Sequence, residues 1–389
     1  MTIPMKMKEI KEIILISMGP ASLLETWSGV PFFLLRELKS RGIIVREVNL
    51  EPHRYIKWIY NRIIMPFVSL FVKGGELSIY RSLFFRIYQF LVLRCRIKTY
   101  KSADVVLGIT SFNIAIPKCS QTTVLFSDWP FSYSLLKQKV QVGRYQNYYL
   151  SLEDKCMRNA DLLVSLFPTC ANYINARLKL KDKAIYLGVN VVNSLMSPPS
   201  PSVVIKKSQQ LRLVFIGRYH YISGAISLLK AYSELRKLLH DCELDIIGLQ
   251  LNDFPKEVAE IADENVRFWG YLDKGIQEQC DIYYDILNKA SLYVNTTPGW
   301  VGYTSMIEAM CFYTPVIVYP CVEFIDEFGE NISFGTYADS SNNLANVILN
   351  TWKNSNYAQM ANNAHFRVAD YTWQTFTDRL IGAISHLHK

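Results

Sequence analysis

Short apolar runs alternate with amphipathic stretches along the whole chain. In the first half the runs fall at 12–18, 43–50, 104–109, 122–127, 161–166 and 184–187. Runs of about four to eight apolar residues between polar turn-formers are typical of strands buried on both faces. Amphipathic segments such as 31–42 lie between them. Because strands and helices alternate, we expect an α/β fold with a parallel sheet covered by helices on both faces.

A second series with the same pattern begins at 211–217 and continues at 243–248, 265–270, 290–295 and 315–319. Its first helix is predicted to bury one apolar face, made by Leu228, Leu229, Tyr232, Leu235, Leu238 and Leu239. Between the two series, 194–208 is rich in proline, serine and lysine, which indicates a linker. We therefore expect one domain over 1–200, a second over 209–370, and a C-terminal amphipathic helix within 371–389.

Length and composition agree with two folded domains. The chain has 389 residues, half of them hydrophobic, which is enough for two separate cores. Its eight cysteines have no Cys-x-x-Cys pair and no histidines at zinc spacing, so reduced thiols in the cytoplasm are expected and no zinc site is predicted. No cofactor is expected either. The first apolar run is too short for a secretory signal, and no uninterrupted run of about 18 apolar residues predicts a membrane span.

The net charge of +8 comes from one stretch, 54–101, which contains ten lysines and arginines against one acid. Bulky aromatic and aliphatic residues are interspersed with these charges. One interpretation is a helix that lies in an anionic membrane interface. The other is a pair of helices that pack one face on the first domain and leave their arginines in solvent. No nucleic-acid recognition motif accompanies the charge, so nucleic acid is not an expected partner.

A candidate anion site follows the run 290–295. A glycine-containing loop, 296–302, leads into a helix that begins near Thr304 or Ser305. Free backbone N–H groups and the positive end of the dipole at such a helix start favour an anion, most often a phosphate. Glu308, one turn later, would accept hydrogen bonds from ligand hydroxyls, or would simply complement the helix dipole.

The order of these motifs resembles the retaining glycosyltransferases of the GT-B fold, specifically the large family four. In the second half the resemblance rests on 214–218 with Gly224, and on 245–248, 266–270, 308–310 and 314–317. In the first half it rests on the glycine loop 26–31 and on 188–190. The segment 371–373 and the amphipathic helix after it are similar to the part of that family which crosses back to the first domain.

The resemblance implies two doubly wound Rossmann-like domains that face a cleft, with an acceptor-binding first domain and a donor-binding second domain. It further implies metal-independent transfer of a sugar, with retention, from a nucleotide sugar to a lipid-linked or oligosaccharide acceptor. The pathway it suggests is bacterial surface polysaccharide synthesis, such as lipopolysaccharide or capsule, at the cytoplasmic face of the inner membrane.

The resemblance also assigns roles to residues. Arg218 would clamp the donor pyrophosphate, helped by the backbone of the helix start and, across the cleft, by close approach of a glycine loop. Glu308 would take the ribose hydroxyls, and the turn after 266–270 would lie near the base. The donor-binding set is Ser28, Arg218, Ser223, Gly224, Gly270, Tyr271, Gly302, Tyr303, Thr304, Ser305 and Glu308.

Asp128 and Gly29 are the catalytic candidates. Asp128 follows the run 122–127 and would position an acceptor hydroxyl or the donor sugar, although a turn residue before Trp129-Pro130 is an equal interpretation. Two positions depart from the family pattern: Trp300 replaces its first glutamate and Ser223 replaces a frequent lysine. They keep open a non-catalytic GT-B protein that binds a nucleotide or a partner glycosyltransferase. A GT-B enzyme of different outcome, such as a nucleotide-sugar epimerase, is a further alternative.

Overall fold

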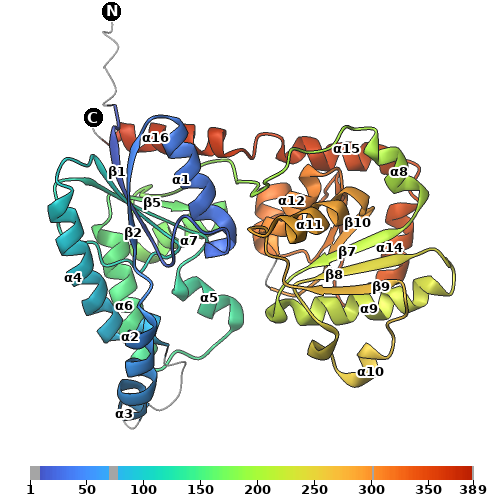
Figure 1. Cartoon of the computed structure of the whole chain (residues 1–389), viewed down its shortest axis with the longest axis horizontal. Helices are drawn as coiled ribbons and strands as arrows, with labels where there is room; N and C mark the ends of the chain where they lie inside the picture. The colour runs from blue at the N-terminus through green and yellow to red at the C-terminus, as the bar shows by residue number, and fades with distance from the viewer. Residues whose placement is uncertain (1–8, 70–77, 300–301, 388–389) are drawn as a thin grey trace, which may run out of the picture. The chain divides into compact units, whose positions relative to one another are not determined.

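The chain folds into two α/β units, drawn in Figure 1. This computed structural model describes residues 9–69, 78–299 and 302–387. The first unit comprises 1–190 together with 373–389, and the second comprises 191–372. The division after residue 190 comes about ten residues before the expected end of the first domain.

The first unit is built on a six-stranded parallel sheet in the order β2-β1-β3-β4-β5-β6. Every residue of β1, β3 and β4 is buried, as expected for central strands covered on both faces. The strands are β1 (Glu12–Ser17), β2 (Ile44–Asn49), β3 (Val105–Ile109), β4 (Thr122–Ser127), β5 (Leu162–Ser165) and β6 (Ala184–Tyr186). Its helices are η1 (Thr26–Gly29), α1 (Val30–Ser40), α2 (Arg54–Ile59), η2 (Tyr60–Ile64), α3 (Met65–Ser69), η3 (Ile79–Arg81), α4 (Leu83–Thr99), α5 (Phe131–Gln138), α6 (Arg144–Asn159) and α7 (Pro168–Leu178).

The second unit repeats this plan with the strand order β12-β11-β10-β7-β8-β9, again all parallel. Its strands are β7 (Arg212–Ile216), β8 (Glu243–Ile247), β9 (Val266–Gly270), β10 (Leu292–Asn295), β11 (Val316–Val318) and β12 (Gly335–Tyr337). Its helices are α8 (Val203–Gln209), η4 (Tyr219–Tyr221), α9 (Ile222–Arg236), η5 (Leu251–Asp253), α10 (Lys256–Ala259), α11 (Gln277–Lys289), α12 (Tyr303–Cys311), α13 (Val322–Phe328), α14 (Leu344–Trp352) and α15 (Tyr357–Val368).

The C-terminal helix α16 (Trp373–His386) belongs to the first unit, as expected. It lies beside α1 in Figure 1. Arg41, at the end of α1, donates to the Asp378 carboxylate at 2.5 Å and to the Gln374 carbonyl at 2.9 Å. The Phe376 ring lies 5.0 Å from that of Phe126 on β4. The last helix therefore completes the core of the first unit.

Two expectations about the second unit need correction. The stretch 194–208 is not only a linker, because its residues from 203 onward belong to α8, in which Val204 and Lys207 are buried. Lys207 donates from Nζ to the carbonyls of Leu287 and Phe312 and to Thr314 Oγ1, at 2.7–2.9 Å. In α9 the expected apolar face is buried at Leu228, Leu229, Tyr232 and Leu235, but Leu238 is 66% exposed because the helix ends at Arg236.

The basic stretch 54–101 forms helices whose described parts expose large apolar side chains. Tyr60 and Phe85 pack together in a small core with Ile79. Outside that core, α2 to α3 expose Tyr55, Trp58, Ile59, Ile63 and Phe67, and α4 exposes Leu83, Phe84, Ile87, Phe90 and Leu91. We call these ten side chains the apolar stripes. Among the described helices, none is both long and apolar enough to cross a membrane.

Candidate functional site

Three glycines mark the carboxyl ends of β7, β8 and β9, where parallel sheets of this kind bind ligands. The Gly248 N–H donates to the Gly270 carbonyl at 2.6 Å, and the Gly217 N–H donates to Ile247 O at 3.0 Å. Gly248 has φ +94°, and a Cβ there would come within 2.5 Å of the Gly217 carbonyl. Backbone, and not side chain, therefore forms this edge of the second unit.

Arg218 leaves β7 at this edge with its side chain exposed. Its guanidinium carbon lies 4.6 Å from the centroid of the Tyr271 ring, which is itself half exposed. Within the described ranges no carboxylate lies at ion-pair distance from Arg218. A guanidinium held over an aromatic ring and without an acid is suited to bind a planar or tetrahedral oxyanion. The structure thus brings two of the predicted donor-binding residues together.

The start of α12 reaches the same edge. Gly302 precedes the helix, and its carbonyl accepts from Ser305 Oγ at 2.9 Å. Ser305 Oγ also lies 3.0 Å from the Tyr293 hydroxyl and 3.5 Å from the carbonyl of Ile216, the last residue of β7. The Tyr303 ring is buried against Phe324, at 5.6 Å between centroids. Only the backbone of Tyr303 is therefore available at the helix start, whose first N–H groups lack intrahelical acceptors. The Thr304 side chain is half-buried.

The start of α9 completes this group of elements. Gly224 is buried, and a Cβ there would lie 3.0 Å from Oδ1 of Asn295, the last residue of β10, and 2.3 Å from Oγ1 of Thr297, in the loop that follows. Glycine is required here so that α9 can approach that loop, which is a packing role in addition to the predicted one. Ser223, one residue earlier, is exposed. Trp300, the other departure from the family pattern, lies outside the described residues.

Glu308 lies in the interior of the second unit. It is 1% exposed, and Lys274 Nζ lies 2.7 Å from each of its carboxylate oxygens. The hydroxyls of Tyr283 and Tyr284, on α11, donate to the same two oxygens at 2.8 and 3.0 Å. Burial and the nearby carboxylate raise the pKa of Tyr283 well above its usual range, so these hydroxyls stay protonated as donors.

The sequence did not predict the three partners of Glu308, which are Lys274, Tyr283 and Tyr284. Lys274 sits in the turn after β9, 34 residues before Glu308, and nothing in its local pattern points to a carboxylate. The Leu195 N–H donates to the Tyr284 hydroxyl at 2.8 Å, so the segment leading into the second unit is attached to the same cluster.

In the first unit, Ser28 and Gly29 form a strained turn between β1 and α1. Trp27, Ser28 and Gly29 all have positive φ, of 41°, 55° and 85°. Such conformations are costly for non-glycine residues and are concentrated at functional sites. Gly29 is buried at the start of α1, whereas Ser28 is exposed. The Trp27 ring lies 5.4 Å from that of Phe126, two residues before Asp128, which brings this turn close to the end of β4.

Asp128 is half-buried and accepts hydrogen bonds through Oδ1 from the Trp129 N–H at 2.8 Å and from Ser127 Oγ at 3.1 Å. Burial raises the pKa of this carboxyl, and the hydrogen bonds only partly oppose that rise. Both interpretations of Asp128 remain compatible with this geometry, because the same bonds that shape a turn also orient the carboxyl.

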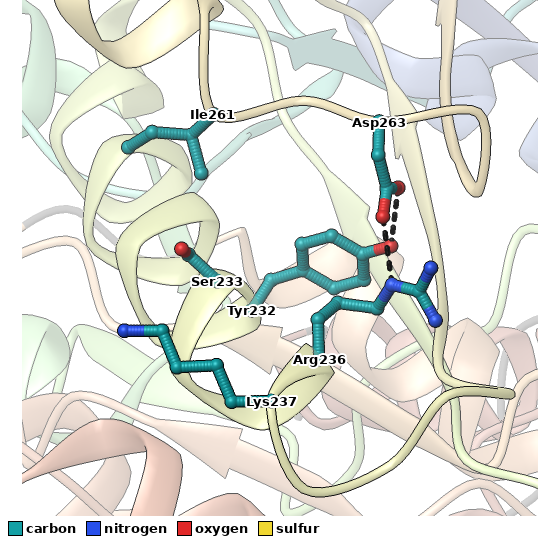
Figure 2. A pocket seen from close by; sticks show the side chains of 6 residues that line it. All are labelled: Tyr232, Ser233, Arg236, Lys237, Ile261 and Asp263. Carbon is teal, nitrogen blue, oxygen red and sulfur yellow. Dashed lines mark hydrogen bonds and ion pairs between the residues drawn. The ribbon is translucent and has the colours of Figure 1, made fainter.

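A separate hollow of about 320 Å³ lies beside the last turns of α9 (Figure 2). Figure 2 shows Tyr232 and Arg236 converging on Asp263, with the Tyr232 hydroxyl and Arg236 Nε each 2.7 Å from its oxygens. Asp263 precedes β9, so this hollow is at the amino ends of the strands, opposite the edge where Arg218 lies. Its polar groups satisfy one another and fasten α9 to the sheet. No group of three or more acidic, histidine or cysteine side chains in the described parts of the chain is arranged to hold a metal.

Comparisons with known proteins agree with this architecture. Residues 210–354, within the second unit, match the family model "Glycosyl transferases group 1". The sequence has no significant match among curated proteins. Sucrose-phosphate synthase from Thermosynechococcus elongatus superposes with a TM-score of 0.67 at 14% identity, covering 97% of this chain and 99% of that one.

Two further solved structures are similar over nearly their full lengths. WaaG, a glycosyltransferase involved in lipopolysaccharide biosynthesis, gives a TM-score of 0.65 at 13% identity, covering 96% of this chain and 99% of WaaG. Anabaena HepE in complex with UDP and glucose gives 0.60 at 13% identity, covering 97% and 100%. Identities this low show the fold alone. The chain therefore has the fold of these GT-B proteins, and part of its second unit, residues 210–354, matches the group 1 glycosyltransferase model.

Proposed function

We propose that this protein transfers a sugar, with retention and without a metal, from a nucleotide-sugar donor to a membrane-associated glycan or lipid-linked acceptor. The observation that carries the proposal is Arg218. It is exposed, has no carboxylate partner in the described ranges, and lies over Tyr271 at the edge where the glycine turns and the α12 start meet. These groups together can neutralise a diphosphate, the part common to nucleotide-sugar donors.

The chemistry follows from where charge develops. As the bond from the sugar to the diphosphate breaks, negative charge grows on the leaving oxygen, and fixed cations and N–H donors that favour this charge lower the barrier. In the proposed mechanism Arg218 and the first N–H groups of α12 supply that stabilisation in place of a metal. Gly29 permits close backbone approach and Asp128 orients the sugar or the acceptor hydroxyl. Retention of the configuration at the anomeric carbon is inferred from the resemblance to family four.

Binding of the ribose by Glu308 is part of this proposal and carries a condition. The carboxylate already accepts from Lys274, Tyr283 and Tyr284, so a ribose hydroxyl has to displace one of them, and the Lys274 ammonium is the most exposed of the three. Glu308→Ala is expected to weaken nucleotide binding more than Asp128→Ala does.

The acceptor and location are inferred from the apolar stripes and the charge around them. A surface that exposes ten large apolar side chains among arginines suits an anionic membrane face better than water. We therefore place the protein at the cytoplasmic face of the bacterial inner membrane, in surface polysaccharide synthesis such as that of lipopolysaccharide or capsule. WaaG, with the same fold, takes part in lipopolysaccharide biosynthesis.

The test is incubation with a panel of UDP-, GDP- and dTDP-sugars, reading thermal shift, nucleotide release and the anomeric configuration of the product. Arg218→Ala is expected to weaken nucleotide binding by roughly 10- to 100-fold, as the loss of a charge-assisted hydrogen bond implies. Lys237→Ala, which removes an exposed cation at the other end of α9, is the matched control.

Each alternative has its own outcome in that assay. Binding without turnover, even with membrane lipid extract as acceptor, would favour the non-catalytic GT-B protein, for which the positions of Ser223 and Trp300 are the sequence argument. Release of an epimerised sugar would identify an epimerase. Absence of a shift with every nucleotide would refute donor binding altogether.

A further inference from the structure

The first unit contains a cavity of about 240 Å³ that none of the predicted site residues line. One wall is a single face of α5, formed by Phe131, Ser134 and Gln138 at helical spacing. The facing wall is the start of α6, with Tyr145 and Tyr149 among its residues. Arg81, from η3, closes one side and lies over the Phe131 ring, with its guanidinium carbon 3.9 Å from the centroid.

These walls are mostly apolar and carry two amides. Three aromatic rings line the cavity together with Leu135 and Val140, and Gln138 and Gln146 add side-chain amides. Gln138 Nε2 donates to Ser134 Oγ at 3.3 Å and Gln146 Oε1 accepts from the Gly143 N–H at 2.6 Å, so each amide keeps its other group for a ligand. Among the described residues that line the cavity, Arg81, stacked on Phe131, is the only charged one, and none is acidic. An acyl chain would pack on the apolar residues but would make no use of the remaining amide groups, and a phosphate would meet a single cation. A sugar ring matches both features, because its C–H face packs on an aromatic ring and its hydroxyls pair with amides.

The size of the cavity limits the ligand. Drug-sized ligands occupy pockets of about 300–1,000 Å³. A volume near 240 Å³ is therefore suited to one sugar ring and not to an oligosaccharide.

The elements around the cavity connect it to the proposed reaction. The helix α5 starts at Phe131, three residues after Asp128, and its first N–H groups donate to the buried Glu153 carboxylate, from Phe131 at 3.0 Å and from Ser132 at 3.4 Å. On the other side, the Tyr145 hydroxyl donates to the Arg81 carbonyl at 2.8 Å, immediately before α4 and its apolar stripe. The cavity thus spans from the helix behind Asp128 to the turn before the proposed membrane face.

We infer that this cavity binds one neutral sugar residue of the acceptor, with that ring packed on the aromatic wall and its hydroxyls paired with Gln138 and Gln146. The inference rests on the proposed function, since it assigns the acceptor and not the donor. On this inference the acceptor is a molecule that carries a glycan at one end and is attached to the membrane at the other.

The test is saturation-transfer NMR on the full chain with methyl glycosides of glucose, galactose, mannose and N-acetylglucosamine. At least one of them is expected to bind the wild type. Ser134→Phe fills the cavity and is expected to weaken that binding at least tenfold, and Gln138→Ala, which removes an amide without filling space, to weaken it severalfold. Leu136→Phe places the same phenyl side chain on the 61% exposed side of α5 and is expected to change nothing.

UDP binding, measured in the same samples, separates this inference from the proposed function. UDP affinity is expected to be equal in the wild type and all three variants. If UDP binds but no glycoside does, or if Ser134→Phe binds the glycoside as the wild type does, the cavity is not a sugar site while the donor proposal stands. Inorganic phosphate is the competing probe: binding of phosphate that Ser134→Phe abolishes, without glycoside binding, would make the cavity an anion site and overturn the inference.

Discussion

Glu308 is a buried carboxylate whose charge is balanced by one lysine and two tyrosines. Removing one partner of a buried, hydrogen-bonded ion pair leaves an uncompensated charge and costs about 3–5 kcal/mol. Lys274→Met is therefore expected to lower the free energy of unfolding of the second unit by about that amount, measured by urea denaturation. Adding Glu308→Gln to Lys274→Met should restore part of the loss, because the charge left behind is then removed as well.

Lys289→Met is the matched control for this prediction. Lys289 pairs with Asp285 on the surface of α11, with both side chains more than half exposed. Such exposed pairs one helical turn apart contribute only about 0.3–0.5 kcal/mol. A loss in Lys274→Met no larger than that in Lys289→Met would mean that Glu308 does not depend on its lysine.

Which residues of the candidate site could be predicted depends on whether their partners are near or far in the sequence. Arg218, Gly302 and Glu308 could be predicted as candidates because a strand end, a glycine loop and a helix start are adjacent in the sequence. Lys274 and the two tyrosines depend on how α11 and the turn after β9 pack against α12, which no local spacing encodes. The packing role of Gly224 against Thr297 was missed for the same reason, since 73 residues separate the two.

At the scale of elements, the start of α5 is held by a buried acid from α6. Burial raises the pKa of Glu153 to about 7 from the usual 4.5, although the Phe131 and Ser132 N–H groups oppose the rise. The folded state thus holds the proton more tightly than the unfolded state. The resulting stability is fully present below about pH 4.5 and is lost as the pH rises to about 7.

Glu153→Gln, which cannot titrate, is expected to remove this pH dependence. The free energy of unfolding of the wild type should fall by about 2–3 kcal/mol from this group between pH 5 and pH 8, and the variant should lack that part of the fall. Chemical denaturation at the two pH values measures it. Glu264→Gln, at a side chain that is 82% exposed, should leave the wild-type slope unchanged. A wild-type slope retained in Glu153→Gln would contradict the assignment.

The elements themselves were largely predictable. The expected strand boundaries differ from those observed by one or two residues at most, because buried parallel strands are short apolar runs with sharp polar ends. Strand β12, Gly335–Tyr337, was missed because its sequence, Gly-Thr-Tyr, is not an apolar run. Helix α8 was missed because it follows a stretch rich in proline and serine and its second half, Lys-Lys-Ser-Gln, is polar. It is held instead by Lys207, a buried ammonium that finds three oxygen acceptors on other elements.

At the scale of the whole molecule, the alternation of strands and helices predicted the fold class. It did not predict how the helices of 54–101 are arranged. Composition showed that this stretch is basic, but it did not show which of its side chains are exposed to water. Helix α4 buries Phe85, Gln89, Leu93 and Ile97 at helical spacing. A second apolar row, through Leu83, Ile87 and Leu91, remains exposed. A sequence pattern that is apolar on two faces does not say which face the sheet covers.

The apolar stripes lead to a prediction about membrane binding. Flotation with vesicles that contain anionic phosphatidylglycerol should recover the wild type at low salt, and less of it at high salt or with neutral phosphatidylcholine. Each lysine or arginine near an anionic surface contributes about 1 kcal/mol, and salt screens that attraction. The combined substitution Trp58→Ser, Phe67→Ser and Ile87→Ser is expected to weaken binding at least tenfold, because it removes three side chains exposed by more than half.

The control is Phe366→Ser, since Phe366 is 68% exposed on α15 of the second unit and lies outside the stripes. It lowers surface apolarity without touching the stretch 54–101, so it should float as the wild type does. Equal loss in Phe366→Ser and in the stripe variant would indicate non-specific adhesion. If the wild type stays with the unbound fraction at low salt, the stripes do not bind lipid. The acceptor would then have to reach the first unit from solution. That outcome is compatible with the proposed sugar cavity beside α5, but it contradicts the membrane location proposed for this protein.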